Sequence, residues 1–383
     1  FVTGEGDMTL DDLAAAVGES ANLPYSAVAA EFDGIYDSLP EATGVNFSAD
    51  MAPELGVFLS VDIAASTPTQ PVLTTVPYEI ANGAAYDPAE KSIVIFQHGW
   101  GGDKENVQAL VGPNGLDLPA IAMDLPLHGD RTPAGGQSGG DFFTINLPQD
   151  RINLYQSYMD MALLLKNLRT GLFDLDNDGD VFIPNATNPD PDDVPSNVFF
   201  VGQSLGAITG SVFAAYNSNE LARIVLNVGG GNLSALMDSA SAPSIAGLVN
   251  ALGVDKNSNE YFTTLGVVQT IIDPADPVYL AASGVPGKTL VQSAFGDTVV
   301  PNISNQILAA AVGHLQKNEV LDVTGSISAD AGWYMFGGEP DHYLPHGFLL
   351  NPQVDAASDR FDPDYVLGAY AAARDQIARF LAD

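Results

Sequence analysis

The chain alternates between short, nearly continuous apolar runs and longer segments in which apolar residues recur every three or four positions. The first pattern is typical of strands buried in a parallel sheet, and the second is typical of helices packed against one. The sequence predicts buried strands at 92–96, 120–123, 197–201, 223–228, 289–293 and 333–336. Two earlier runs, 56–61 and 75–80, predict strands separated by proline-rich turns.

Helical spacing appears between residues 150 and 170, where Ile152, Tyr155 and Met159 share one face and predict an amphipathic helix. The same spacing predicts a final helix that includes Ile377. Residues 1–50 are rich in alanine and predict an N-terminal helical extension. Strands that alternate with helices in this way favour a mostly parallel, doubly wound sheet.

The segment between the strands at 223–228 and 289–293 is too long for a simple crossover. Residues 233–285 are rich in Ala, Ser, Leu and Val, so we expect them to be helical. We predict that they form a cap or lid inserted over the edge of the sheet; the alternative is an extra helical layer packed elsewhere. The core then consists of residues 51–232 and 286–383, and the length of 383 residues suits one large domain with an insertion.

The most specific motif is Gly202-Gln203-Ser204-Leu205-Gly206, which follows the apolar run 198–201 and precedes a segment rich in Ala, Ile, Val and Phe. This context matches a nucleophile elbow, a tight turn between a strand and a helix that exposes a serine hydroxyl. Glycine fits the two outer positions because it has no Cβ to collide with the crowded backbone. We therefore predict that Ser204 is a nucleophile and not an inert serine in a glycine-rich turn.

A nucleophilic serine needs a histidine that takes its proton and an acid that orients the histidine. After a nucleophile elbow these residues follow in the order serine, acid, histidine. Asp297 is the predicted acid because it lies in a glycine turn directly after an apolar strand. Its alternative role is to cap that turn. Asp273 and Asp276 are weaker candidates, because no comparable strand precedes them.

Three of the five histidines do not fit the role of base. His98 and His128 precede the serine in the chain, which is the wrong order. His314 lies on an apolar stretch that comes before the predicted last strand, so we expect it to be packed.

The two remaining histidines, His342 and His346, both follow the predicted last strand and precede the final helix. We predict that His346 is the base, because its neighbour Gly347 suits a loop that must bend toward the serine. His342 is the alternative base and is otherwise expected to be a neighbouring polar contact.

The tetrahedral intermediate of acyl transfer carries an oxyanion that preorganised N–H groups must stabilise. One donor is expected at Leu205, directly after the nucleophile, and the other in a loop after an early strand. That loop is residues 98–102, where glycines flank Trp100 and let the backbone approach a substrate closely. We predict that Trp100 supplies the second N–H and that His98 supports the loop; the alternative is a glycine-rich loop with a packed tryptophan.

The charge of the chain and its lack of cysteine limit the classes of partner and of site that we expect. The chain has 48 acidic and 13 basic residues, a net charge of −35. Such a surface repels nucleic acid and anionic membranes, so we exclude a nucleic-acid role. It suits a protein in salty water or one that binds cations.

The absence of cysteine excludes disulfides, a catalytic thiol and thiolate metal sites. No apolar run reaches transmembrane length. We expect a secreted, extracellular or cell-surface protein whose leader or anchor was removed before Phe1.

A second motif points to a metal. Residues 174–181 match the first part of a calcium loop, D-x-D-x-D-G, with an aspartate at every second position. The predicted ligands of a structural Ca²⁺ are Asp174, Asp176, Asp178 and Asp180. The twelfth position is Asn185 in place of the usual bidentate glutamate, so a further ligand is needed. Candidates for this ligand are Asp190, Asp192 and Asp193. The alternative is a solvated acidic turn.

Taken together, these residues resemble serine esterases and lipases of the α/β-hydrolase superfamily. More narrowly, the chain is similar to large bacterial extracellular or surface-lipoprotein lipases. That group has an acidic D-x-D-x-D-G segment shortly before G-x-S-L-G, an H-G pair after an early strand, and a D-x-P-x-H-G run, here residues 124–129. The resemblance extends from about Thr75 to the C-terminus. It departs at Gln203, where histidine is frequent, at Ala207, where glycine is frequent, and in the absence of a lipid-anchor cysteine.

The resemblance implies an α/β-hydrolase fold and the hydrolysis of carboxylic esters through an acyl-enzyme, with no cofactor for the chemistry. Expected partners are small-molecule or lipid esters, with contact to a lipid surface or to a synthetic polyester. No oligomeric state follows from the sequence. A peptidase or acyltransferase on the same triad is the alternative within enzymes. A non-catalytic, calcium-stabilised surface binding protein is the alternative outside them.

Overall fold

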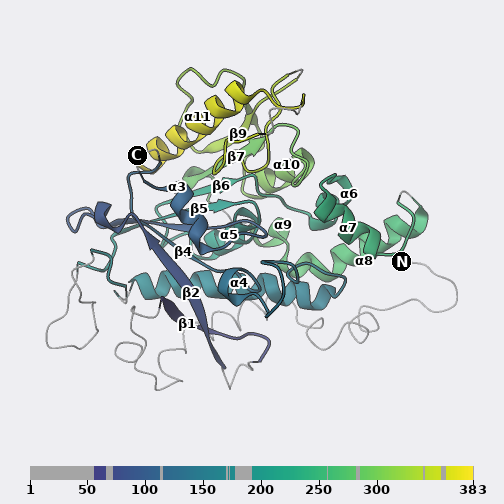
Figure 1. The fold of residues 1–383 in the computed structure, drawn as a ribbon, viewed down its shortest axis with the longest axis horizontal. Helices are drawn as coiled ribbons and strands as arrows, with labels where there is room; N and C mark the ends of the chain where they lie inside the picture. The colour runs from purple at the N-terminus through teal and green to yellow at the C-terminus, as the bar shows by residue number, and fades with distance from the viewer. Residues whose placement is uncertain are drawn as a thin grey trace.

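The computed structural model describes residues 56–65, 72–112, 115–169, 171, 173–176, 192–256, 258–281, 285–339, 341–354 and 359–382. The predicted N-terminal helical extension, residues 1–50, lies outside them. Among these residues a nine-stranded sheet forms the centre of the molecule, in the order β1-β2-β4-β3-β5-β6-β7-β9-β8 (Figure 1). The strands are β1 (Val57–Val61), β2 (Leu73–Ala81), β3 (Ser92–Gln97), β4 (Ala120–Met123), β5 (Asn197–Gln203), β6 (Arg223–Asn227), β7 (Thr289–Ala294), β8 (Lys317–Val320) and β9 (Gly332–Phe336).

The predicted strands all occur, and β2 alone runs antiparallel to both of its neighbours. The other neighbouring pairs are parallel, so the carboxyl ends of β3, β5, β6, β7 and β9 meet at one edge. β8 was not predicted, since this edge strand is polar and three of its four residues are exposed. An edge strand of this kind carries no continuous apolar run because only part of it is buried.

Helices cover both faces of the sheet. They are α3 (Val107–Leu110), α4 (Leu147–Arg169), α5 (Leu205–Tyr216), α6 (Leu233–Ser239), α7 (Pro243–Ala251), α8 (Asn259–Ile272), α9 (Pro277–Leu280), α10 (Asn302–Ala311) and α11 (Pro363–Ala382). Ile93 and Ile95 of β3 join the core on the side of α4 and α5, while Val94 and Phe96 join the core on the side of α3 and α11. Figure 1 shows α4 and α11 on opposite sides of the sheet. No described helix has the length and apolar character that a membrane span needs.

The helix predicted at 150–170 exists as α4, but its predicted amphipathic character is wrong. It is buried on nearly every side because β1, α5 and α8 all pack against it. Polar groups on the buried faces are therefore paired inside the protein. The carboxylate of Asp160, which is fully buried, accepts from Arg131 at 2.7 Å and from the hydroxyl of Ser60.

Residues 233–285 are helical as expected and contain α6 to α9. α8 packs on α4 and α6, and α6 packs on α10 (Figure 1). The backbone N–H groups of Ser241 and Ala242, between α6 and α7, both donate to the carbonyl of Thr298 at 3.0 Å. This helical segment is thus attached to the loop after β7, and its function as a lid stays a prediction.

The strand order, the antiparallel β2 and the layers of helices on both faces form the α/β-hydrolase fold that the sequence predicted. In this fold the loops at the carboxyl ends of the parallel strands lie at one edge of the sheet. The loops after β3, β5, β7 and β9, together with the first residue of α5, contain all five residues predicted for the chemistry, which explains how residues 246 positions apart come together.

Candidate active site

Ser204 lies on the turn between β5 and α5, where its backbone adopts φ 57° and ψ −119°. This region is unfavourable for a residue with a Cβ and persists only where the surroundings enforce it. The glycines on either side allow the close approach: a Cβ at Gly202 would lie 2.4 Å from the carbonyl oxygen of Gly206, and one at Gly206 would lie 2.1 Å from that of Gln97. The turn therefore has the strained geometry expected of a nucleophile elbow, and it fixes the backbone of Ser204.

His346 and Asp297 complete a hydrogen-bonded row with this hydroxyl. The Nε2 atom of His346 lies 2.6 Å from Oγ of Ser204, and its Nδ1 atom lies 2.6 Å from Oδ2 of Asp297. The carboxylate accepts the proton of Nδ1, which leaves Nε2 free to accept the hydroxyl proton of the serine. The structure thus brings together the three residues predicted as nucleophile, base and acid.

Asp297 is held in place by its own loop after β7. Its Oδ1 atom accepts from the backbone N–H groups of Val299 at 2.8 Å and Val300 at 3.1 Å, so Oδ2 is directed to His346. The preceding Gly296 has φ 71°, and its N–H donates to Asn302 at 2.9 Å. The carboxylate is therefore oriented before the histidine carries any charge.

The other two candidate acids serve a different purpose. Asp276 is fully buried and accepts from the backbone N–H groups of Asn232, Leu233 and Val278 at the start of two helices. Asp273 accepts from the side chain of Gln269 at 2.6 Å. Both carboxylates organise the helices of residues 233–285, and neither contacts His346 among the described residues.

The other candidate base also lies away from the serine. The ring of His342 stacks on Tyr365, with the centroids 4.1 Å apart and the planes at 27°. His314 follows α10, and its Nε2 lies 2.9 Å from the carbonyl oxygen of Thr289, which is the packed position expected for it. The structure therefore brings His346, and not His342, to Ser204.

The predicted oxyanion donors lie on both sides of the nucleophile. A Cβ at Gly99 would lie 2.9 Å from Cβ of Ser204, so the loop after β3 touches the elbow. Within the described part of the chain, the backbone N–H groups of Trp100 and Leu205 donate to no other group. The indole of Trp100 is fixed by a hydrogen bond from Nε1 to the carbonyl of Gly139 at 2.6 Å. Two N–H groups are thus available for an oxyanion.

His98 supports this loop from within the protein. It is fully buried; its Nδ1–H donates to the carbonyl of Gly99 at 2.8 Å, and its Nε2 accepts from the N–H of Leu125 at 3.2 Å. Burial, together with the nearby His128, lowers the pKa of His98 to about 3. The ring is therefore uncharged at neutral pH, and it links the loops after β3 and β4.

This histidine predicts an acid sensitivity. The pKa of His98 is lowered on folding, so the unfolded chain binds a proton at this residue more readily than the folded protein does. The contribution of the neutral ring to the free energy of unfolding is therefore complete above about pH 6.5 and declines as the pH falls toward 3. Between pH 7 and pH 5 we expect a loss of about 2 kcal/mol in the free energy of unfolding. Urea unfolding of the native protein and of His98→Gln across this range measures it. The inference is wrong if both proteins show the same pH dependence.

Asp124 is a residue whose role the sequence did not reveal. It directly follows β4 and is fully buried, and its carboxylate accepts from the backbone N–H groups of Lys104 at 2.8 Å and Asp130 at 2.9 Å. The side chain of Lys104 adds an ion pair at 3.4 Å. Asp124 therefore anchors the chain that leaves the loop at 98–102. The D-x-P-x-H-G run contained this residue, but only the tertiary contacts show what it holds.

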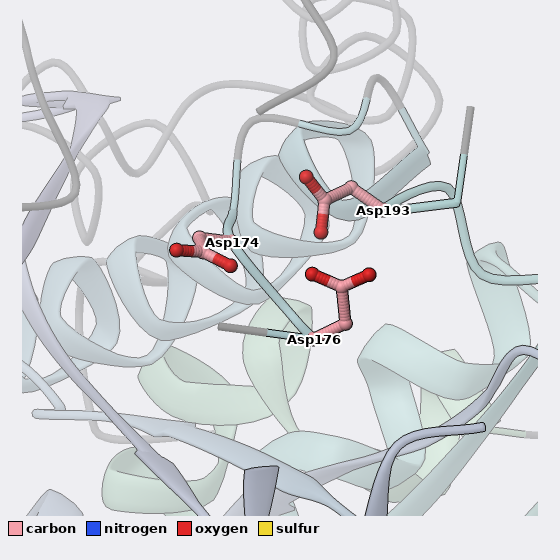
Figure 2. A group of neighbouring side chains, drawn as sticks. All are labelled: Asp174, Asp176 and Asp193. Carbon is pink, nitrogen blue, oxygen red and sulfur yellow. The ribbon is translucent and has the colours of Figure 1, made fainter. Parts of the chain in front are cut away.

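The predicted metal ligands are partly described. Asp174 and Asp176 come together with Asp193, and one carboxylate oxygen of each lies within 4.8 Å of the others. Figure 2 shows the carboxylate of Asp193 directed toward the other two. Asp178 and Asp180 lie outside the described residues. A cluster of carboxylate oxygens is the type of ligand set that Ca²⁺ prefers.

No family model matches this chain, and neither does any curated protein. Solved structures do. An enol-lactonase from Burkholderia xenovorans is 13% identical over 81% of this chain and 97% of its own, with a TM-score of 0.41. An esterase from Pyrococcus furiosus is 11% identical over 88% and 98%, with a TM-score of 0.41. An acylaminoacyl peptidase from Pyrococcus horikoshii is 11% identical over 85% and 41%, with a TM-score of 0.44. At this level of similarity they do not decide the reaction of this chain.

Proposed function

We propose that this protein is a serine hydrolase that cleaves carboxylic esters through an acyl-enzyme. The observation that carries the proposal is the hydrogen-bonded row from Ser204 through His346 to Asp297 on a strained elbow. Oγ of Ser204 attacks the ester carbonyl carbon while Nε2 of His346 takes the hydroxyl proton. Asp297 stabilises the imidazolium that forms, and the N–H groups of Trp100 and Leu205 stabilise the oxyanion.

The same residues complete the reaction. As the tetrahedral intermediate collapses, the bond to the alcohol breaks and His346 donates its proton to the leaving oxygen. Water then attacks the acyl-enzyme with His346 as the base, which releases the carboxylic acid and restores the hydroxyl of Ser204. The chemistry requires no cofactor.

Apolar residues beside the oxyanion loop support esters with an apolar acyl group. The half-buried rings of Trp100 and Phe143 pack edge to face, with centroids 6.0 Å apart. Ile145, two residues further along, is 64% exposed. The apolar pair of Trp100 and Phe143 suits the acyl chain of a lipid or the surface of a polyester. The acidic protein would disfavour anionic substrates.

The test of this function is hydrolysis of p-nitrophenyl esters from acetate to palmitate. Activity on long chains would establish a lipase, and a preference for short chains would indicate an esterase or polyesterase. Peptide amides and added alcohol acceptors separate a peptidase or an acyltransferase from an ester hydrolase. A folded protein that cleaves no ester at any chain length contradicts the proposal.

We also propose that Asp174, Asp176 and Asp193, with Asp178 and Asp180, hold a structural Ca²⁺. Support comes from the D-x-D-x-D-G pattern and from the approach of the three described carboxylates. A cation that binds only the folded state stabilises it, by about 2.7 kcal/mol at a concentration a hundredfold above Kd.

The calcium proposal predicts a higher melting temperature when Ca²⁺ is added after treatment with EDTA. Thermal unfolding of the native protein and of Asp193→Asn measures it, and the variant is expected to lose most of the shift. The neighbouring Asp192→Asn is the matched control, since Asp192 pairs with Lys91 at 3.0 Å and is outside the cluster. An equal calcium shift in all three proteins contradicts the site.

A further inference from the structure

Four amide side chains form a row on the face of the sheet that α11 covers. Gln203 of β5 lies opposite Asn227 of β6 in the strand register, and Asn227 lies opposite Gln292 of β7. Gln376 of α11 continues the row. All four are more than nine-tenths buried: Gln203 is 7% exposed, and the other three are fully buried. Four buried amide side chains side by side are uncommon, because each of them needs hydrogen-bond partners inside the protein.

The hydrogen bonds of the row all point away from the active site. Nδ2 of Asn227 donates to Oε1 of Gln292 at 3.1 Å, and Nε2 of Gln292 donates to Oε1 of Gln376 at 2.9 Å. Nε2 of Gln376 donates to the carbonyl of Ser328 at 2.6 Å. Amides aligned in one direction polarise one another and behave as a unit. This order leaves an acceptor, Oδ1 of Asn227, at the end nearest to Ser204.

That end of the row carries the unmatched polar groups. Within the described residues, Oδ1 of Asn227 is buried without a hydrogen-bond partner, and the amide of Gln203 makes no hydrogen bond. A buried polar atom without a partner lowers stability, so Oδ1 of Asn227 needs a reason. Gln203 and Asn227 occupy directly opposite positions in the strand register.

The other side of Gln203 touches the oxyanion loop. A Cβ at Gly99 would lie 2.6 Å from Oε1 of Gln203, beside its contact with Ser204. The carbonyl of Gly99 is held separately, by the N–H of Gly102 at 3.0 Å and by the ring of His98. Gly99 is therefore clamped between His98 and Gln203, and the next residue is Trp100, whose N–H is a proposed oxyanion donor.

We propose that Gln203 is a positioning residue for the oxyanion loop. Its strand neighbour Asn227 is held by the row of amides, and the side chain of Gln203, packed on Gly99, sets the distance between the loop and Ser204. The inference rests on the proposed ester hydrolysis, because an oxyanion hole matters only for that class of reaction. Since the N–H groups act on charge that develops in the transition state, a displaced loop lowers kcat and leaves KM nearly unchanged.

Gln203→Met tests this inference, because methionine keeps the length of the side chain and removes the amide. We expect a fall in kcat of roughly 10- to 100-fold on a p-nitrophenyl ester, with KM within about twofold of the native value. The affinity for an alkylboronic acid, which forms a tetrahedral adduct on the serine, is expected to fall with kcat.

Gln97→Met is the matched control. Gln97 ends the neighbouring strand β3 and is fully buried, but the alternation of side chains places it on the opposite face with Ile95. Its amide donates to the carbonyl of Met123 at 3.2 Å. We expect this control to lower the melting temperature while kcat stays within about threefold of the native value. Should Gln203→Met not fold, Gln203→Leu replaces it with the same expected result.

The outcomes separate this inference from the proposed function. If the native protein cleaves esters and an organophosphonate labels Ser204, but Gln203→Met keeps the native kcat, the positioning role is wrong. An equal loss of kcat in Gln97→Met and Gln203→Met also overturns it, because general damage would then explain both. If the native protein cleaves no ester and Ser204 is not labelled, the proposed function itself fails.

Discussion

Ser204→Ala is expected to lower kcat for ester hydrolysis on the order of a millionfold, with little change in stability. Among Ser204, His346 and Asp297, only the serine hydroxyl can form the acyl-enzyme, and the other two residues act only through it. Serine hydrolases that lose the nucleophile of the triad lose a factor of this size, and the residual rate comes from the oxyanion hole and from binding. Steady-state kinetics on a p-nitrophenyl ester measure the change.

Ser211→Ala provides the matched control for this variant. Ser211 lies in α5, two turns beyond the nucleophile, and is 3% exposed. Its hydroxyl donates to the carbonyl of Ile208 at 2.8 Å, within the helix. The control should keep native kcat. Native activity in Ser204→Ala, with the purified protein free of contaminating esterase, contradicts the mechanism.

Asp297→Asn is expected to lower kcat about ten-thousandfold, because it changes the tautomer of His346 and leaves the geometry intact. In the native protein the carboxylate of Asp297 accepts the Nδ1 proton of His346 at 2.6 Å. An amide can donate to Nδ1 in its place, which moves the proton to Nε2, where it opposes the hydroxyl of Ser204. The loss should be in kcat, and measurement across pH distinguishes it from a shifted optimum.

Asp276→Asn is the control for the acid. Asp276 was a candidate from the sequence, is fully buried, and accepts from three backbone N–H groups. Its replacement should lower the melting temperature because the buried contacts weaken, while kcat of the folded enzyme stays near the native value. The assignment of Asp297 is wrong if Asp276→Asn shows the larger fall in kcat.

Most of the sheet could be predicted because its central strands are buried on both faces. The run 92–96 is apolar at nearly every position since helices cover both sides of β3. The apolar pattern was misleading for one largely exposed element, β8, and for one almost completely buried element, α4. β8 is a polar edge strand without an apolar run, and α4 carries buried polar residues whose partners lie on distant segments. Local patterns record burial, and they do not record which remote groups satisfy a polar side chain.

The site shows the same limit. Ser204 and Asp297 could be proposed from their places after strands, since strand ends meet at one edge of the sheet. His342 and His346 share one loop, and the sequence favoured His346 only through the glycine beside it. The stacking of His342 on Tyr365 is a tertiary contact that no local pattern contains. The contact of Gln203 with Gly99 depends likewise on how the loop after β3 folds over the elbow.

The nucleophilic role of Ser204 can be measured by covalent labelling with a p-nitrophenyl alkylphosphonate, followed by peptide mass spectrometry. The phosphonate reacts with an activated serine and leaves a stable tetrahedral adduct. If Ser204 is the nucleophile, we expect one equivalent of adduct on Ser204, loss of esterase activity in proportion to labelling, and no adduct in Ser204→Ala. Full activity after complete labelling elsewhere, or an unlabelled Ser204 in the folded and active protein, would contradict it.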